Sequence, residues 1–240
     1  MKIKFTQALA FLFIVLCFIS CSDPERPDDC RVSAVVAFRD DTVVFQRLEY
    51  VFDNDNLIRT IQSRKEFQDT IEIIYKNGIV DGLNISNNYV VNFIRDDDGR
   101  VIESRADFDS HYSYFLRYDE KGRLDARFSK FHNDTTFYTY DDNDNLIKEE
   151  TKQNNTGYIY ITENTYIDKP NHMHFLSTYF PFDPTSKSLI EQVRKYITVN
   201  GKRELFDGYD YVYEFNSNGL PVKQVSQQAS YPVKFEYLCK

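Results

Sequence analysis

The sequence predicts an all-β protein: an antiparallel meander of hairpin repeats with a period of about 22 residues, curled into an open or closed barrel-like sheet. Three observations lead to this prediction. Short acidic turns that end in Gly or Asn recur at nearly constant spacing, the stretches between turns alternate apolar and polar residues, and 16% of the chain is aromatic. All-β domains often run to about 200–250 residues, so the 240 residues suit a single domain.

The N-terminus predicts export and lipid attachment. Residues 1–20 begin with a basic stretch, continue with a charge-free apolar run and end in Phe-Ile-Ser, which is the layout of a secretory signal. The apolar run is shorter than the ~20 residues that span a bilayer. Cys21 follows directly, and this arrangement resembles the lipobox of bacterial lipoproteins. The resemblance implies a signal peptide over residues 1–20 and diacylglycerol on Cys21. An ordinary signal peptide followed by a chance Cys is the alternative.

Residues 21–29 are expected to form an acidic tether. After Cys21 they contain two prolines and four acidic residues and no apolar side chain, so they cannot bury surface. An acidic stretch behind a lipidated Cys resembles the surface-export signal of some Gram-negative gut anaerobes. That resemblance implies an outer-membrane lipoprotein that faces the exterior, and the alternative is a plain spacer on the periplasmic face. The net charge of −8 disfavours a nucleic-acid partner.

The folded domain is expected over residues 30–240, with one cysteine in its first strand and one in its last. Cys30 lies on the apolar face of the alternating stretch 30–38, and Cys239 lies on that of 233–239. Exported proteins can keep disulfides. A bridge between Cys30 and Cys239 would close a loop around nearly the whole domain, and two buried free thiols are the alternative.

The acidic turns explain the repeat. In Asp119-Glu120-Lys121-Gly122 the Asp side chain can accept backbone N–H groups, and Gly can adopt the left-handed conformation that closes the turn. Asn is expected to replace Gly in two copies because Asn tolerates that conformation. The closing residues are Asn56, Gly78, Gly99, Gly122 and Asn145.

The stretches between the turns read as half-buried strands. Residues 112–118 and 209–215 place aromatic and aliphatic side chains at every second position, with polar residues between them. Polar turns separate the acidic ones, so each repeat contains two strands and two turns. We expect roughly 13–16 strands, and a meander of that length must curl or close.

The segment "RYDEKGRL" at 117–124 resembles a YD (RHS-type) repeat. The whole pattern resembles a family of uncharacterised gut-anaerobe lipoproteins with YD repeats and a porin-like β-fold, and residues 165–176 and 208–223 are similar to its C-terminal part. The resemblance covers about residues 30–240 and implies a fold, not a chemistry. Most copies lack the full Tyr-Asp pair. The polar faces carry many charges, so membrane contact is expected through the lipid anchor only.

Residues 169–189 break the repeat and carry the candidate ligand-binding side chains Phe175, Tyr179, Phe180 and Phe182. Aromatic loops on a rigid scaffold often bind ligands. The alternative is that these rings cap an open end of the curled sheet. The 18 Tyr of the chain favour stacking on sugars, although many are expected in buried positions and Trp is absent.

Searches for other chemistry exclude most function classes. A nucleophile elbow, a phosphate loop and an HExxH motif are all missing, so we expect neither an enzyme nor a cofactor. The pair His172 and His174 lacks a third ligand, and the acidic turns lack EF-hand spacing, so no metal is expected. Three Asp-Thr pairs resemble the O-glycosylation signal of these anaerobes, which makes Thr42, Thr70 and Thr135 candidate modification sites.

The sequence therefore predicts a surface-exposed lipoprotein that acts, as a monomer, as a binding or interaction module for an extracellular glycan or protein. The alternative is a structural envelope or adhesin-type component with no small-molecule ligand. A deep groove lined by accessible Tyr would favour glycan binding, whereas a filled interior with a flat polar surface would favour the structural role.

Overall fold

Sixteen antiparallel strands form the described part of the chain. The computed structural model describes residues 30–39, 43–64, 67–86, 89–107, 111–226, 228 and 231–239. In chain order the strands are β1 (Cys30–Arg39), β2 (Val43–Asp53), β3 (Asn56–Arg64), β4 (Phe67–Lys76), β5 (Ile79–Ile85), β6 (Tyr89–Arg95), β7 (Val101–Ala106), β8 (Tyr114–Tyr118), β9 (Leu124–Ser129), β10 (Asp134–Tyr140), β11 (Leu146–Gln153), β12 (Ile159–Pro170), β13 (Ser188–Val199), β14 (Lys202–Phe215), β15 (Pro221–Ser226) and β16 (Val233–Cys239).

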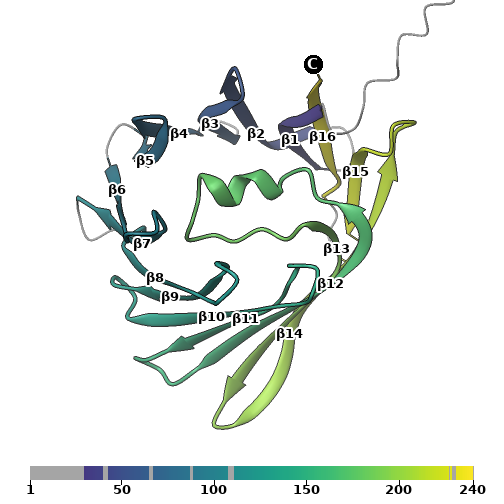
Figure 1. Ribbon diagram of the computed structural model, residues 1–240. Coiled ribbons are helices and arrows are strands. Elements are labelled where there is room, and N and C mark those ends of the chain that lie inside the picture. The colour runs from purple at the N-terminus through teal and green to yellow at the C-terminus, as the bar shows by residue number, and fades with distance from the viewer. Residues whose placement is uncertain are drawn as a thin grey trace, which may run out of the picture.

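Each strand pairs with the next, and β1 pairs with β16, so the meander closes into a barrel (Figure 1). The predicted all-β meander is confirmed, and of the two predicted forms the sheet adopts the closed one. Closure leaves no open sheet edge in the described strands, which removes the unpaired backbone groups that promote aggregation.

The acidic turns share one hydrogen-bond pattern. In the turn between β8 and β9, Asp119 Oδ1 accepts the backbone N–H groups of Lys121 (3.0 Å) and Arg123 (2.8 Å). Gly122 has a φ of +78° and donates its N–H to the Asp119 carbonyl. The turns that begin at Asp96, Asp141 and Asn216 repeat this use of a side-chain oxygen. The repeat is therefore a series of turns that satisfy their own backbone.

The prediction for the two Asn-containing turns was wrong in position. The left-handed residues are Asn54 (φ 52°) and Asp144 (φ 63°), not Asn56 and Asn145. Asn54 belongs to a two-residue turn, because Asp53 already pairs with Asn56. Asn145 is buried, and its side-chain oxygen accepts the N–H of Ser188 at 2.8 Å.

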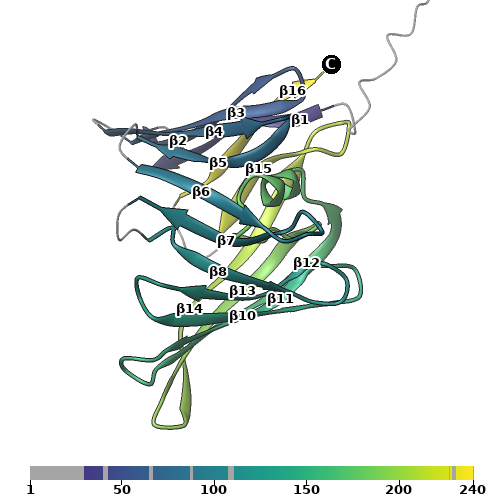
Figure 2. The same cartoon turned by 60° about the vertical axis from the view of Figure 1, so that its left-hand side comes forward.

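The barrel has two different ends. We call the end that carries the acidic turns the turn end; it also holds the first residue of β1 and the last residue of β16. We call the opposite end the rim end; there lie the turns near residues 130–133, 154–157 and 200–201 and the connections from β1 to β2, β3 to β4, β5 to β6, β7 to β8 and β15 to β16. Figure 2 shows the C-terminus beside the turn end.

Alternation places one face of every strand inside the barrel. Leu57 and Leu83 are completely buried, and Val91 joins them in a core formed mainly by β2 to β10. Burying a side chain of this size contributes ~1.5–3 kcal/mol. The outer face instead carries ion pairs between strands, such as Arg47 of β2 with Glu236 of β16 at 2.7 Å, which spans the intervening β1.

A disulfide closes the barrel at the turn end. Cys30 and Cys239 lie opposite each other on β1 and β16, and the structure joins their Sγ atoms. The bond links residues 209 positions apart. The two strands that complete the barrel are therefore held covalently as well as by hydrogen bonds.

Candidate functional site

The connection between β12 and β13 folds into the barrel. We call residues 171–187 the plug; they include a short 3₁₀-helix, η2 (His174–Thr178), and lie inside the ring of strands in Figure 1. No helix in the described part of the chain is both long and apolar enough to cross a bilayer.

The plug begins and ends at one clamp. The backbone N–H of Asn171 donates to the Lys187 carbonyl (2.7 Å), and the Asn171 side chain donates to the Ser186 carbonyl (2.9 Å). Pro181 and Pro184 lie between, and proline cannot donate to a strand ladder. The local sequence therefore favours a compact loop over a continued hairpin.

Aromatic rings of the plug pack against the inner wall. Phe175 contacts the ring of Tyr50, with the centroids 6.0 Å apart. Tyr179 accepts the backbone N–H of Leu57 through its hydroxyl at 3.3 Å. Phe182 packs against Tyr114, with the centroids 5.4 Å apart. These contacts make the plug part of the hydrophobic core.

The structure thus separates the four candidate ligand-binding residues. Tyr179 and Phe182 are buried, and Phe175 and Phe180 are half-buried. Phe180 and Phe182 line a cavity in the lumen. Phe175 and Tyr179 do not line this cavity and pack against Tyr50 and Leu57 of the wall. The segment lies inside the barrel rather than as a free surface loop, and ligand binding at these rings stays a prediction.

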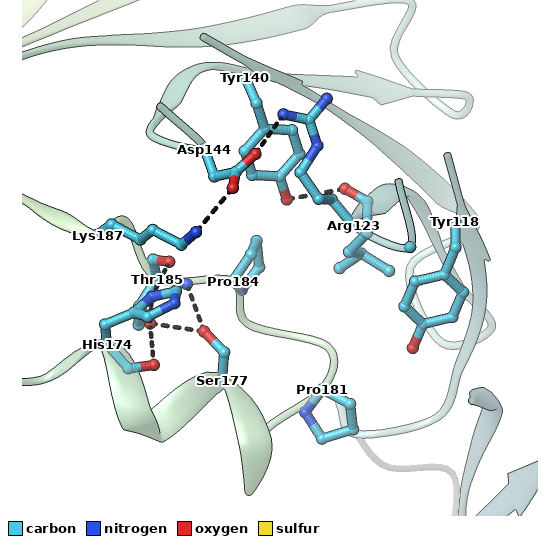
Figure 3. Close-up of a pocket in the computed structure, with 12 residues that line it drawn as sticks. Tyr118, Arg123, Tyr140, Asp144, His174, Ser177, Pro181, Pro184, Thr185 and Lys187 are labelled. Atoms are coloured by element: carbon cyan, nitrogen blue, oxygen red, sulfur yellow. Dashed lines mark hydrogen bonds and ion pairs between the residues drawn. The ribbon is translucent and has the colours of Figure 1, made fainter. Parts of the chain in front are cut away.

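A first cleft lies at the turn end, between the plug and the turns of β8–β9 and β10–β11 (Figure 3). We call it the latch cleft; its volume is about 270 Å³. Asp144 accepts hydrogen bonds from Arg123 (2.9 Å) and from Lys187 (2.8 Å) across it. Lys187 first, and Arg123 next, hold the pKa of the Asp144 carboxyl below its usual range.

The polar groups on the plug side of the latch cleft also form hydrogen bonds with one another. The Thr185 hydroxyl donates to the His174 carbonyl (2.9 Å), and the Thr185 N–H donates to the Ser177 hydroxyl (2.9 Å), as Figure 3 shows. Polar groups that already satisfy one another gain little from a ligand. We therefore interpret the latch cleft as the fastening of the plug.

A larger cavity of about 660 Å³ lies in the lumen between the plug and the wall of β2 to β6. We call it the lumen cavity. Its floor is formed by the plug residues Leu176, Phe180, Phe182 and Asp183, and Tyr89, which is 44% exposed, lies where it reaches the rim end. Ligand sites in proteins commonly have volumes of ~300–1,000 Å³ and combine apolar rings with a few polar groups. The lumen cavity has both properties.

Polar groups of the lumen cavity make few hydrogen bonds within the described protein. Tyr50 is 5% exposed, and its hydroxyl has no hydrogen-bond partner among the described residues. Burial raises the pKa of Tyr50, so this hydroxyl is protonated at neutral pH. Asp69 accepts one hydrogen bond, from the Ser86 hydroxyl at 3.2 Å. Free hydrogen-bonding capacity distinguishes this cavity from the latch cleft.

Three charged groups meet beside the plug. Arg127 donates to the Phe182 carbonyl (2.7 Å), and its guanidinium lies 4.8 Å from the centre of the Tyr114 ring. Asp183 and Glu149 both interact electrostatically with Arg127. The surrounding protein desolvates both carboxyls and raises their pKa values, although Asp183 remains accessible to water from the cavity.

The other predicted sites fall in different places. Thr70 and Thr135 are half-buried positions of β4 and β10, on the strand faces opposite to the lumen. Thr42, Cys21 and the segments 1–20 and 21–29 lie outside the described residues. Within the described ranges, no group of three His, Cys, Asp or Glu side chains could hold a metal ion.

Sequence reasoning missed Tyr50, Asp69 and Asp183 as site residues. The pattern placed Tyr50 in a strand, but nothing local shows that its hydroxyl lacks a partner. A signal was present at residues 181–184, Pro-Phe-Asp-Pro, where an acidic residue is fixed between two prolines inside an aromatic segment.

Comparison with known proteins supports the fold. No protein-family model matches the chain, and no curated protein matches it in sequence. A porin-like protein from Bacteroides uniformis ATCC 8492 is similar in structure, with a TM-score of 0.57 at 13% identity over 90% of this chain and 99% of that chain. At this identity the likeness shows the fold alone, and it agrees with the porin-like fold that the predicted resemblance implied.

Two toxin assemblies give weaker likenesses. A TcdB2-TccC3 structure aligns at 11% identity and a TM-score of 0.38, over 75% of this chain and 9% of that chain. A Photorhabdus luminescens Tc holotoxin pore aligns at 15% identity and a TM-score of 0.34, over 77% of this chain and 12% of that chain.

Proposed function

We propose that this protein is a lipid-anchored binding protein of the bacterial outer membrane, and that its lumen cavity receives part of an extracellular glycan through the rim end. The observation that carries the proposal is the cavity itself: about 660 Å³ of space that the plug floors but does not fill. A structural barrel without a ligand gains nothing from unfilled space, because dense packing stabilises a core.

The lining suits a sugar. A pyranose ring has an apolar face that packs on aromatic side chains, and hydroxyls at its edge that need hydrogen bonds. Tyr89, Tyr112 and Phe180 supply rings, while Gln62 and Asp69 supply polar atoms. Tyr89 is exposed and Tyr112 is half-buried, so this lining supports glycan binding over a purely structural role.

The rim end extends the aromatic surface. Among the described residues, most large apolar side chains that are exposed lie beside a rim-end turn: Val43, Val44, Phe67, Tyr89, Phe131, Tyr158, Leu205, Phe206 and Tyr231. Further sugar units that emerge from the cavity would contact these exposed apolar side chains. A longer glycan would therefore gain contacts that a single sugar lacks.

The position of Cys30 gives the proposal an orientation. A lipid on Cys21 would hold the turn end toward the membrane, because the tether 21–29 joins the barrel there. The rim end would then point away from the membrane, toward the exterior if the protein is exported to the surface. Ion pairs on the outer face, such as Arg117 with Asp125 at 2.6 Å, support membrane contact through the anchor only.

A protein ligand is the second candidate, and the rim end favours it. Leu205 and Phe206 are 59% and 55% exposed at the rim-end tip of β14, outside the lumen cavity. Exposed apolar groups of this kind mark interaction surfaces when they gather in one place. A partner that docks on this tip would leave the lumen cavity empty.

The test is a glycan-array screen of the full chain purified in mild detergent, followed by calorimetry on any glycan that binds. Tyr89→Ala should weaken binding at least about tenfold, which corresponds to about 1.4 kcal/mol. The matched control is Phe215→Ala, an exposed aromatic side chain at the turn end of β14 that does not line the cavity. Equal losses in both variants would move the site out of the cavity, and the absence of any bound glycan would overturn the proposal.

A further inference from the structure

The charged groups that line the lumen cavity are all acidic. Among the described lining residues these are Asp69 on β4 and Asp183 on the plug, and no Lys, Arg or His joins them. Low-dielectric walls concentrate the field of such groups, so the cavity attracts cations and repels anions. A sugar acid or a phosphorylated sugar would enter against this field.

Asp183 has no partner that neutralises it. No described residue donates a hydrogen bond to its carboxylate or lies within ion-pair distance of it, and its interaction with Arg127 is electrostatic only. The nearby Arg127 directs its guanidinium to the Phe182 carbonyl and the Tyr114 ring, and it is shared electrostatically with Glu149. One guanidinium therefore serves two carboxylates. A carboxylate without an ion-pair partner at the wall of a cavity attracts a cation that supplies the opposite charge.

The Tyr50 hydroxyl is a second and independent sign of a ligand. It is buried without a partner in a residue that lines the same cavity, and leaving such a group unpaired is unfavourable. Tyr50 can both donate and accept. A ligand hydroxyl or amine would satisfy it, whereas an apolar ligand would not.

We propose that the lumen cavity selects a glycan that carries a free, positively charged amino group, with Asp183 and Asp69 as the carboxylates that attract the ammonium and Tyr50 as a hydrogen-bond partner of the sugar. The ligand class is therefore an amino sugar that is not N-acetylated. This inference rests on the proposed function, because it assigns the chemistry of the same cavity.

The probe is a pair of oligosaccharides that differ only in charge: β-1,4-linked glucosamine oligomers and their N-acetylated counterparts, titrated into the full chain by calorimetry. The free-amine oligomer should bind at least about tenfold more tightly. Asp183→Asn should remove most of this preference, and Asp69→Asn should reduce it independently if the plug variant folds poorly. The control is Asp142→Asn, an exposed acidic side chain of the turn end that lies outside the cavity.

Tyr50→Phe separates a binding role from a structural one. If the hydroxyl serves a ligand, its removal should lower affinity for the free-amine oligomer while the urea midpoint of unfolding stays the same or rises. A lower midpoint with unchanged affinity would show that the hydroxyl has a structural partner, and would remove Tyr50 from the site.

The outcomes separate this inference from the proposed function. Equal or tighter binding of the N-acetylated oligomer, or binding of other glycans and neither oligomer, overturns the inference and leaves the proposed function standing. Binding of no glycan at all overturns both. If both Asp183→Asn and Asp69→Asn still prefer the free-amine oligomer, the ammonium binds elsewhere. That result overturns the assignment of these two carboxylates.

Discussion

The turn end and the lumen of the barrel use similar residues in opposite ways. At the turn end, acidic side chains accept backbone N–H groups in the turns, or form ion pairs such as Asp144 with Lys187. In the lumen, Asp183 and Tyr50 line the lumen cavity, and neither the Asp183 carboxylate nor the Tyr50 hydroxyl has a hydrogen-bond partner among the described residues. The comparison shows that partners, not residue types, distinguish a group that stabilises the fold from one that is available to a ligand.

The plug connects the turn end with the lumen cavity. Its base is fastened at the turn end by the clamp at Asn171 and by the latch cleft, and its rings form the floor of the lumen cavity. A rigid floor preorganises the cavity, which reduces the conformational entropy that a ligand must overcome. Weakening the turn end should therefore affect stability first and the cavity second.

The largest effect is expected for Phe182→Ala. Phe182 is 6% exposed and packs against three rings of the wall, so its truncation should destabilise the protein by ~3–5 kcal/mol. Phe180→Ala, in the half-buried neighbour that also lines the cavity, should cost clearly less. Urea denaturation of both variants measures the difference. Equal and small losses would mean that the plug is not part of the core.

Removal of the disulfide should have the next largest effect. Replacing Cys30 and Cys239 by Ser is expected to lower the free energy of unfolding by ~2–5 kcal/mol, because the bond restricts the unfolded chain over nearly the whole domain. Denaturant unfolding of the double variant gives the value. Wild-type protein with the bond reduced serves as the control, and a double variant as stable as the oxidised wild type would show that the bond does not form in the protein.

Asp183→Asn should change stability in a pH-dependent way. Desolvation raises the Asp183 pKa above the value of ~3.9 found in unfolded chains, so the folded state binds more protons in the interval between the two values. Wild-type stability therefore falls as pH rises through that interval, and the variant lacks this loss. Between about pH 4 and pH 7, the urea midpoint of the variant should rise relative to that of the wild type. A constant difference would contradict the unpartnered charge.

The smallest effect is expected for Asp144→Asn in the latch cleft. Its lowered pKa means that its ion pairs contribute at neutral pH and are lost only as pH falls through the depressed value. Because the group is at the surface, the variant should lower the thermal midpoint only slightly, and ligand affinity should not change. Asp142→Asn, in the same turn, is the matched control. A marked loss of affinity in Asp144→Asn would show that the latch cleft also binds ligand.

Local patterns predicted most of the barrel. Alternation in 112–118 and 209–215 and the spacing of the acidic turns indicated strands and hairpins correctly, because a half-buried strand and an Asx turn each depend on a few neighbouring residues. The left-handed residue was misplaced in two turns. Each of these turns contains several Asn and Asp residues, any of which can adopt a positive φ, and the structure uses Asn54 and Asp144.

The candidate site was less accessible to sequence reasoning. Phe180 and Phe182 were named as binding residues from their composition, but their place in the lumen depends on the plug turning inward, which no local pattern specifies. The free state of the Tyr50 hydroxyl depends on atoms from distant strands and the plug. Whether a buried hydroxyl lacks a hydrogen-bond partner is decided only when the whole barrel has closed. Local sequence patterns therefore do not predict it.

The disulfide also has a mechanical consequence. If the chain is anchored and binds a polymer as proposed, flow on the polymer would pull on the barrel from the rim end, and the membrane would resist through the chain that precedes Cys30. Without a covalent link, that tension would act on β1 alone, and only the hydrogen bonds of β1 to β2 and β16 would resist it. With Cys30 joined to Cys239, the tension enters both strands at once, so the barrel must shear along its whole seam to open.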